Sequence, residues 1–374
     1  MDNLAHSLVG AWMAEAGLKR YTPLATATLV IGANLPDVDA VVTFAGSDAS
    51  LYWRRGWTHG VLALALWPFV LTGLMLLWDR FVRRRRHPDL APARAGPLLL
   101  LSTVSVLSHP ALDWLNTYGV RLLMPFDGTW FYGDALFIVD PWVWLLAGAA
   151  VIMADARTRK SVAGWGVLGI ATTALVMFPA FVPWPAKVLW AVGVAAIVWL
   201  RLKGTHVVPT QRVATVCGVG LVLYLGAIFL GSQVAAPRAQ QWLRAHGHPV
   251  ERVIAGPVPA NPFVRDLIAL GPDRYHFVRA DFLRGGDGHL EISGPTLPRE
   301  PNPGPVIQAA LAAPHLRGLA NWLRLPTYQV AETEAGWRVT IDDVRYSRSQ
   351  SGGLGSAVVE LDKELRLVKR PTVE

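Results

Sequence analysis

Long apolar runs dominate the first 236 residues of this chain. Six runs of about 17–22 residues hold few or no charges, over 60–78, 96–114, 137–154, 161–181, 184–200 and 213–234. A helix of about 20 apolar residues can cross roughly 30 Å of hydrocarbon. Two shorter apolar runs, 6–18 and 23–35, either cross a packed part of a bundle or lie re-entrant. The pattern predicts a mainly α-helical, polytopic transmembrane bundle of about six to eight helices.

The pattern changes after residue 234, where the sequence becomes more polar and rich in proline. Apolar and polar residues alternate over 275–282, 289–293, 337–341 and 357–361, which predicts half-buried antiparallel strands. Residues 306–323 carry apolar side chains at a helical spacing between Pro305 and Pro326, which predicts one amphipathic helix. We therefore expect a transmembrane domain over 1–236 and a small extramembrane α+β domain over 237–374.

The positive charges are distributed unevenly between the loops that join the apolar runs. One alternating set of loops holds fourteen Lys and Arg residues, and the other set holds only four: Arg54, Arg55, Arg121 and Lys187. Because cytoplasmic loops carry the excess of Lys and Arg, the first set is predicted to be cytoplasmic. This topology accounts for most of the net charge of +8, so no nucleic-acid partner is expected. It also places residues 237–374 on the external, periplasmic side of a multi-pass inner-membrane (plasma-membrane) protein.

Six His and Asp residues lie in or beside the apolar runs of the first third of the chain: His6, Asp37, Asp39, His59, His109 and Asp113. Ionisable groups in such segments are costly, which favours a functional role. Imidazole and carboxylate together suit a divalent ion such as zinc or manganese. The loop pattern places all six on the external face, whereas His87 and His206 fall on the opposite side. The sequence thus predicts a membrane-embedded metal site.

Local spacing refines the expected role of each candidate ligand. His109 and Asp113 are four residues apart, so one helix face presents both, either to a metal or to an interhelical hydrogen bond. Pro36 is expected to end a helix and free Asp37 to act as a ligand. Asp39 is either a second ligand, a group that orients a ligating histidine, or a general base.

The remaining candidates each have a structural alternative. His59 stands in a short Gly-flanked entry to a helix, and we expect it to bind the metal. His6 is either a ligand or, with Asn3, part of a helix cap. Arg54 and Arg55 break the positive-poor external side, so they either bind an anionic substrate and stabilise developing charge or contact lipid headgroups.

Together these motifs resemble the YdjM/YbcI-type family of inner-membrane, predicted metal-dependent hydrolases. The resemblance covers residues 1–130 and rests on His6, Leu35-Pro36-Asp37-Val38-Asp39, Arg55-Gly56-Trp57-Thr58-His59, and His109 through Asn116 and Gly119. That family is distantly similar to zinc-dependent phospholipase C and P1-type nucleases, which hydrolyse phosphate esters with three metals. The likeness implies one or two ions here, zinc first and manganese second, held by His6, Asp37, His59, His109 and a bridging Asp113.

Two functions are consistent with these observations. The first is an integral-membrane hydrolase in which a metal-activated water attacks an ester or phosphoester of a lipid-like, amphipathic or anionic small substrate. In that mechanism Asp39, Arg54 and Arg55 are the expected catalytic residues, and membrane lipids are expected partners. The alternative is a non-catalytic membrane protein, either a scaffold with a structural metal or a metal carrier. A carrier requires ionisable groups near the midplane and on both sides of it, and the cytoplasmic halves of the segments offer almost none.

Overall fold

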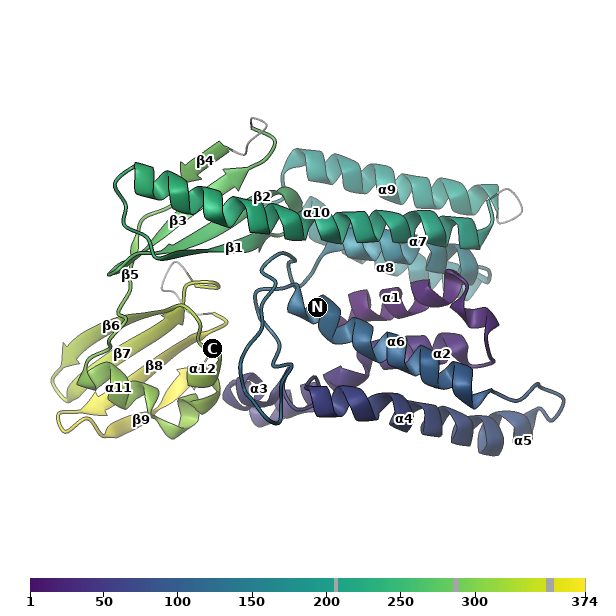
Figure 1. The fold of residues 1–374 in the computed structure, drawn as a ribbon, viewed down its shortest axis with the longest axis horizontal. Coiled ribbons are helices and arrows are strands. Elements are labelled where there is room, and N and C mark those ends of the chain that lie inside the picture. The colour runs from purple at the N-terminus through teal and green to yellow at the C-terminus, as the bar shows by residue number, and fades with distance from the viewer. Residues whose placement is uncertain (205–207, 285–288, 348–352, 374) are drawn as a thin grey trace. The chain divides into compact units, whose positions relative to one another are not determined.

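The computed structural model describes residues 1–204, 208–284, 289–347 and 353–373, and it runs from helices into strands along the chain (Figure 1). The chain folds into two compact units. The first comprises Met1–Val38, Arg55–Leu230 and Pro257–Pro262, and the second comprises Asp39–Arg54, Gly231–Gly256 and Phe263–Glu374. The predicted fold class is confirmed, whereas the predicted domain boundary at residue 236 stays a prediction. His206 lies outside the described residues.

Close helix crossings bring together α1 (Asn3–Glu15), α2 (Ala25–Asn34), α4 (Val61–Trp78) and α6 (Ala95–Trp114). Helix α2 packs against α1 and α6, and α4 packs against α6. A Cβ atom at Gly10 of α1 would lie 2.6 Å from the Leu29 carbonyl oxygen, and one at Gly32 of α2 would lie 2.0 Å from Ser105 Oγ. Small residues at such crossings let helix backbones approach closely in a membrane.

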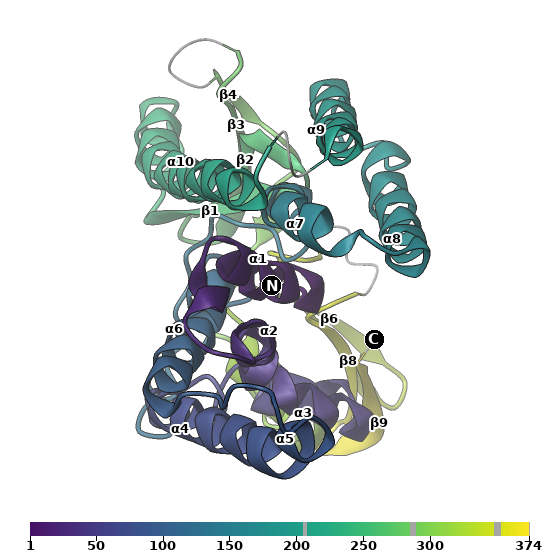
Figure 2. The same ribbon diagram turned by 90° about the vertical axis from the view of Figure 1, so that its right-hand side faces the viewer.

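The first unit also contains three later helices: α7 (Pro141–Asp155), α8 (Arg159–Met177) and α9 (Trp184–Lys203). Helix α7 packs against α1, α8 and α9 (Figure 2). A fourth helix, α10 (Thr210–Ala245), follows. Leu8, Leu29, Leu136, Val143 and Ile228 belong to one buried apolar cluster, so the core of this unit draws on both its N-terminal and its later helices.

Six helical segments of the described chain are long and apolar enough to cross a membrane: Ala25–Ala45, Val61–Arg86, Ala95–Trp114, Arg159–Met177, Trp184–Lys203 and Thr210–Ala245. The first is longer than the predicted run 23–35, because a 3₁₀ helix (Leu35–Ala45) continues after α2. The predicted end of the α-helix near Pro36 is therefore confirmed. The run 137–154 is shorter than predicted, because Asp140 caps a 15-residue α7 by accepting hydrogen bonds from the backbone N–H groups of Trp142 and Val143.

Two antiparallel sheets follow α10. One has the order β1-β2-β3-β4 with β5 on β3, from β1 (Arg252–Val258), β2 (Asn261–Leu270), β3 (Arg274–Asp281), β4 (His289–Ile292) and β5 (Leu297–Pro298). The other has the order β6-β7-β8-β9, from β6 (Pro326–Thr333), β7 (Gly336–Asp343), β8 (Ser356–Asp362) and β9 (Leu367–Val373). The four predicted strands correspond to β3, β4, β7 and β8. Val278 of β3 and Val339 of β7 are fully buried, whereas the residues of β4 are half-buried or exposed.

The predicted single helix over 306–323 is wrong. The structure has α11 (Pro305–Leu311), a 3₁₀ turn (Pro314–Leu316) and α12 (Arg317–Trp322). The break falls at Pro314, which has no N–H to donate and disrupts a helix interior. Helix α12 packs against α3 (Ser47–Trp53), and the backbone N–H of Leu319 donates to Asp48 Oδ1 at 2.9 Å. The segment Asp39–Arg54 thus belongs to the same compact unit as the C-terminal strands.

Candidate metal centre

Three separate parts of the first unit supply the predicted ligands. His109 and Asp113 lie one turn apart on α6. Asp37 lies at the start of the 3₁₀ helix that follows α2, and His59 lies in the turn before α4. The packing of α2 and α4 against α6 brings these four side chains into one buried group, so the structure confirms that they meet.

The ligand atoms of the four residues converge at the spacing that one small ion requires. His59 Nε2 and His109 Nε2 are 3.1 Å apart. Asp113 Oδ2 lies 3.5 Å from each of these nitrogens, and Asp37 Oδ1 lies 3.8 Å from each. A tetrahedral zinc ion with ligand distances of about 2.0–2.1 Å separates its ligand atoms by about 3.3–3.4 Å. The donor types and their spacing therefore fit a single divalent ion.

A hydrogen bond to the backbone fixes the chemical state of His109. Its Nδ1 atom lies 2.6 Å from the carbonyl oxygen of Ala33 on α2. Because a carbonyl only accepts hydrogen bonds, Nδ1 carries the proton, and in the neutral ring Nε2 presents its lone pair to the group. The predicted interhelical hydrogen bond thus exists, but it uses the nitrogen that faces away from the other ligands. The hydrogen bond of His109 is therefore confirmed, and its role as a metal ligand stays a prediction.

The turn that carries His59 is held by its neighbours on both sides. Thr58 Oγ1 lies 2.9 Å from His59 Nδ1, and the indole N–H of Trp67 donates to the Thr58 carbonyl at 3.0 Å. A Cβ atom at Gly60 would lie 2.2 Å from the Met124 carbonyl oxygen, so only glycine fits this approach. These contacts orient the imidazole with Nε2 toward the other ligands, as outer-sphere partners of metal-binding histidines do.

Cationic and polar groups surround Asp113. Arg55 Nε lies 3.1 Å from Asp113 Oδ2, while its Nη1 donates to Asn116 Oδ1 at 3.0 Å and its guanidinium stacks 4.5 Å from the Tyr118 ring centroid. The α-amino group of Met1 donates to Asp113 Oδ1. Arg55 is only 4% exposed, so it is placed to hold this carboxylate. The predicted contact between Arg55 and substrate stays a prediction.

His6 lies beside the four-residue group. Its Nε2 atom is 3.3 Å from Asp113 Oδ1, and its ring stacks on His109 with centroids 3.8 Å apart. Its Nδ1 atom is buried and has no hydrogen-bond partner among the described residues. The predicted capping role is wrong, because Asp2 caps α1 by accepting from the Ala5 N–H. Contact with Asp113 and a buried, unpaired nitrogen suit a histidine at the edge of a metal site.

Asp39 and Arg54 belong to the second unit. Arg54 Nε lies 3.8 Å from Asp39 Oδ1, so the two predicted catalytic residues form an ion pair with each other. The Arg54 side chain is 28% exposed, in contrast to the buried Arg55. Their roles as general base and substrate-binding group stay predictions.

Several supporting residues were absent from the predicted site. Asn3 Nδ2 donates to Asp37 Oδ2 at 3.3 Å, and Asn116 Oδ1 accepts from Arg55. Thr58 contacts His59. Asn116 and Thr58 stand within the motifs that carry the ligands, so their position beside a ligand was the available signal. Asn3 gave no comparable signal, because its contact with Asp37 depends on the packing of α1 against α2.

Comparison with known proteins agrees with these features. Residues 1–182 match the YdjM inner membrane protein family. The predicted resemblance is confirmed over this region, which contains all four converging ligands. The chain is also 26% identical over 120 residues to the uncharacterized protein YfhP of Bacillus subtilis (strain 168), a match that spans 32% of this chain and 33% of that protein. No solved structure gives a significant match.

The YdjM match and the helices agree on the setting of the site. An inner-membrane family and six helices of sufficient length and apolarity describe a multi-pass membrane protein. The buried Asp37, His59, His109 and Asp113 form a group that could hold a metal ion within it. The expected external position of this group stays a prediction.

Proposed function

We propose that this protein is an integral-membrane, metal-dependent hydrolase. The convergence of Asp37, His59, His109 and Asp113 carries the proposal. Catalytic zinc sites use histidine and carboxylate ligands, whereas structural zinc sites are typically built with cysteine. The single cysteine, Cys217, lies in α10 and is not part of the group. The histidine and carboxylate donors therefore favour a catalytic metal site over a structural one.

The roles of the residues follow from their positions. A divalent ion held by the four ligands would polarise a substrate oxygen and lower the pKa of a water toward 7. Arg55 holds Asp113 in place, and His6 borders the same carboxylate. In the proposal Asp39 accepts a proton as general base, and Arg54 binds an anionic group of the substrate.

The proposed substrate is an ester or phosphoester of a lipid-like or amphipathic molecule. A multi-pass protein with its ligands on membrane-associated helices is well placed to receive a substrate from the bilayer. The fourteen-to-four asymmetry of positive charge supports an external site with access from the outer leaflet. Zinc is the first candidate metal and manganese the second.

One observation favours the alternative of a structural metal. His59, His109 and Asp113 are fully buried, and four protein ligands around one ion would leave no open position. Closed four-ligand sites are typical of structural zinc, whereas catalytic zinc keeps a position for water. The alternative predicts stoichiometric metal without hydrolysis, so the two functions can be separated by experiment.

The test uses purified full-length protein in lipid nanodiscs, loaded with zinc or manganese and assayed on phospholipids, carboxyl esters and phosphoesters. The proposal predicts hydrolysis that chelation removes, that metal restores, and that Asp37→Asn and His109→Ala abolish. Metal-loaded protein that binds its ion but hydrolyses none of these substrates would support the structural alternative. Equal hydrolysis by the parent and His109→Ala would show that a different site is responsible.

Arg54 and Arg55 provide a matched pair for this assay. Arg54→Ala should raise KM for an anionic substrate, because the variant loses charged hydrogen bonds worth about 1.5–3 kcal/mol of binding free energy. Its metal content should be unchanged. Arg55→Ala should instead weaken metal binding, because it removes the partner of Asp113. Unchanged KM in Arg54→Ala would remove the support for an anionic substrate.

A further inference from the structure

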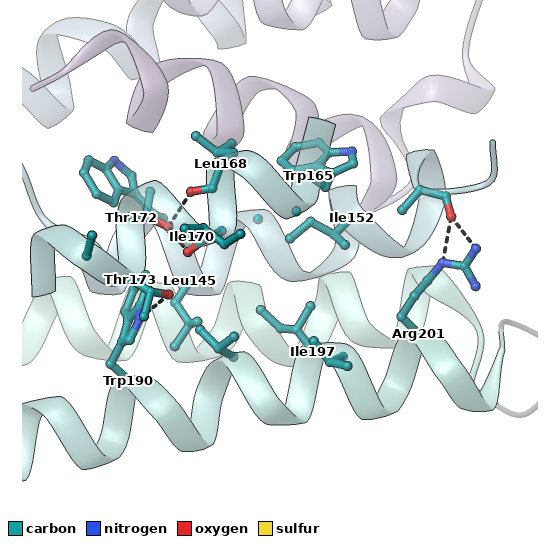
Figure 3. Close-up of a pocket in the computed structure, with 18 of the residues that line it drawn as sticks. Leu145, Ile152, Trp165, Leu168, Ile170, Thr172, Thr173, Trp190, Ile197 and Arg201 are labelled. Carbon is teal, nitrogen blue, oxygen red and sulfur yellow. Dashed lines mark hydrogen bonds between the residues drawn. The ribbon is translucent and has the colours of Figure 1, made fainter. Parts of the chain in front are cut away.

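A cavity lies in the first unit, along helices α7, α8 and α9 and one face of α1. Its volume is about 670 Å³. Figure 3 shows apolar side chains along it, such as Ile152, Leu168 and Ile197, with Trp190 toward one end and Arg201 at the other. The metal ligands are not among the residues that line it. It is a long apolar space with a cation at one end.

The surroundings of this cavity determine what can fill it. Helices α8 and α9 are both long and apolar enough to cross a membrane, and few of their residues are buried in the protein. In a bilayer, these two helices would hold the cavity within the hydrocarbon region. Apolar cavities exclude water, and no water is available at that depth to solvate polar groups. A hydrocarbon chain is the occupant that suits such a space.

The end at Arg201 is suited to an anionic group. Arg201 Nε donates to the carbonyl oxygen of Ala156 at 2.7 Å, and Nη2 donates to the same oxygen. No described residue accepts a hydrogen bond from its Nη1. Four other cations stand near in sequence to Ala156 or Arg201: Arg157, Arg159, Lys160 and Lys203. Asp155, which precedes Ala156 in sequence, accepts a hydrogen bond from the indole N–H of Trp165 at 2.8 Å.

We propose that this cavity binds one anionic phospholipid, with an acyl chain between α7, α8 and α9 and its phosphate at Arg201. Basic pockets between transmembrane helices are known to bind anionic headgroups. Arginine is the residue that best matches a phosphate, because its guanidinium offers several donors in a fixed plane. The site is separate from the metal centre, and the proposal does not depend on hydrolase activity.

Two glycines on α8 provide a matched pair of variants. Gly169 lines the cavity, whereas Gly164 does not, and a Cβ atom at either position would meet no heavy atom within 4 Å. Gly169→Leu therefore fills the cavity without a clash at Cβ, and Gly164→Leu is its control. Leucine also has the higher helix propensity, so both variants are expected to keep α8 intact.

The experiment measures lipid retained by the full chain after extraction in mild detergent, using native mass spectrometry and lipid analysis. We expect one anionic phospholipid per parent chain and per Gly164→Leu chain. Gly169→Leu and Arg201→Gln should each lower retention about tenfold, and Arg201→Lys should lower it less.

Three outcomes would overturn the proposal. Retention in Gly169→Leu equal to that in Gly164→Leu would place the lipid elsewhere. If Arg201→Gln retains as much lipid as the parent, then the phosphate does not bind at Arg201. Equal amounts of zwitterionic and anionic lipid on the parent would indicate bulk lipid only.

Discussion

Two fully buried aspartates, Asp113 in the first unit and Asp343 in the second, both pair with an arginine but differ in their other neighbours. Asp343 is saturated with donors. Its two oxygens accept five hydrogen bonds of 2.8–3.3 Å, three from the backbone N–H, Nε and Nη2 of Arg345 and two from the backbone N–H groups of Arg324 and Leu325. Nothing further is needed to compensate the buried charge.

Asp113 also pairs with an arginine, Arg55, but the same carboxylate oxygen additionally faces two histidine nitrogens. Its Oδ2 atom lies 3.5 Å from the Nε2 atoms of His59 and His109, and the latter presents a lone pair. Asp113 Oδ1 accepts from the Met1 α-amino group, whereas Asp113 Oδ2 and the His109 lone pair face the same buried space, where a further cation would reduce their mutual repulsion. The comparison separates a carboxylate whose hydrogen bonds all come from its own unit's backbone and Arg345 from one that lies in a group that could hold a metal ion.

The largest expected effect is on metal affinity at the ligands. His59→Ala and His109→Ala should each weaken binding more than about 100-fold, which exceeds the 10–100-fold loss typical of outer-sphere changes. Competition with a chelating dye measures the affinity. His87→Ala, an exposed histidine after the arginine run, is the matched control and should bind as the parent does. If both ligand variants bind metal as tightly as the parent, then Asp113 and its neighbours do not form a metal site.

The next effect concerns stability in the second unit. Asp343→Ala should destabilise this unit by about 3–5 kcal/mol, because it leaves the buried Arg345 without its partner. Metal content per chain should be unchanged. Hydrogen exchange of peptides from the C-terminal strands measures the change in stability. A loss of metal as large as that in His109→Ala would contradict the distinction between the two aspartates.

The same residue predicts a dependence on pH. Burial alone would raise the pKa of Asp343, but the Arg345 charge and the hydrogen bonds to both oxygens hold it below its ordinary value. Its stabilisation is therefore complete above the unfolded pKa of about 3.9 and is lost as pH falls through the lower folded value. Asp343→Asn should remove this part of the acid dependence. Identical acid unfolding in parent and variant would show that Asp343 contributes nothing to it.

A smaller effect is expected at the residues that orient the ligands. Asn3→Ala and Thr58→Val should each lower metal affinity about 10–100-fold, because they remove the contacts to Asp37 and His59. Asn321→Ala, an asparagine of α12 in the second unit, is the control and should leave affinity unchanged. Full affinity in both site variants would mean that the backbone alone fixes the ligands.

The convergence of Asp37, His59, His109 and Asp113 could be expected from the sequence for a physical reason. Charged and imidazole side chains are rare in apolar segments, so His109 and Asp113 stood out from their helix. The supporting role of Asn3 could not be predicted, because it depends on how α1 packs against α2. The break at Pro314 shows that the missing N–H of proline outweighs the helical spacing of the apolar residues over 306–323. The sequence also could not show that Arg55 faces Asp113 and not the surface.

The central claim is that Asp37, His59, His109 and Asp113 hold one divalent ion, and X-ray absorption at the zinc edge tests it most directly. Purified, zinc-loaded protein should show only nitrogen and oxygen neighbours at about 2.0–2.2 Å, with the multiple scattering of two imidazoles, and no sulfur. His109→Ala should lose one imidazole contribution or the metal itself. A sulfur neighbour, or an identical spectrum from His109→Ala and the parent, would contradict the assignment.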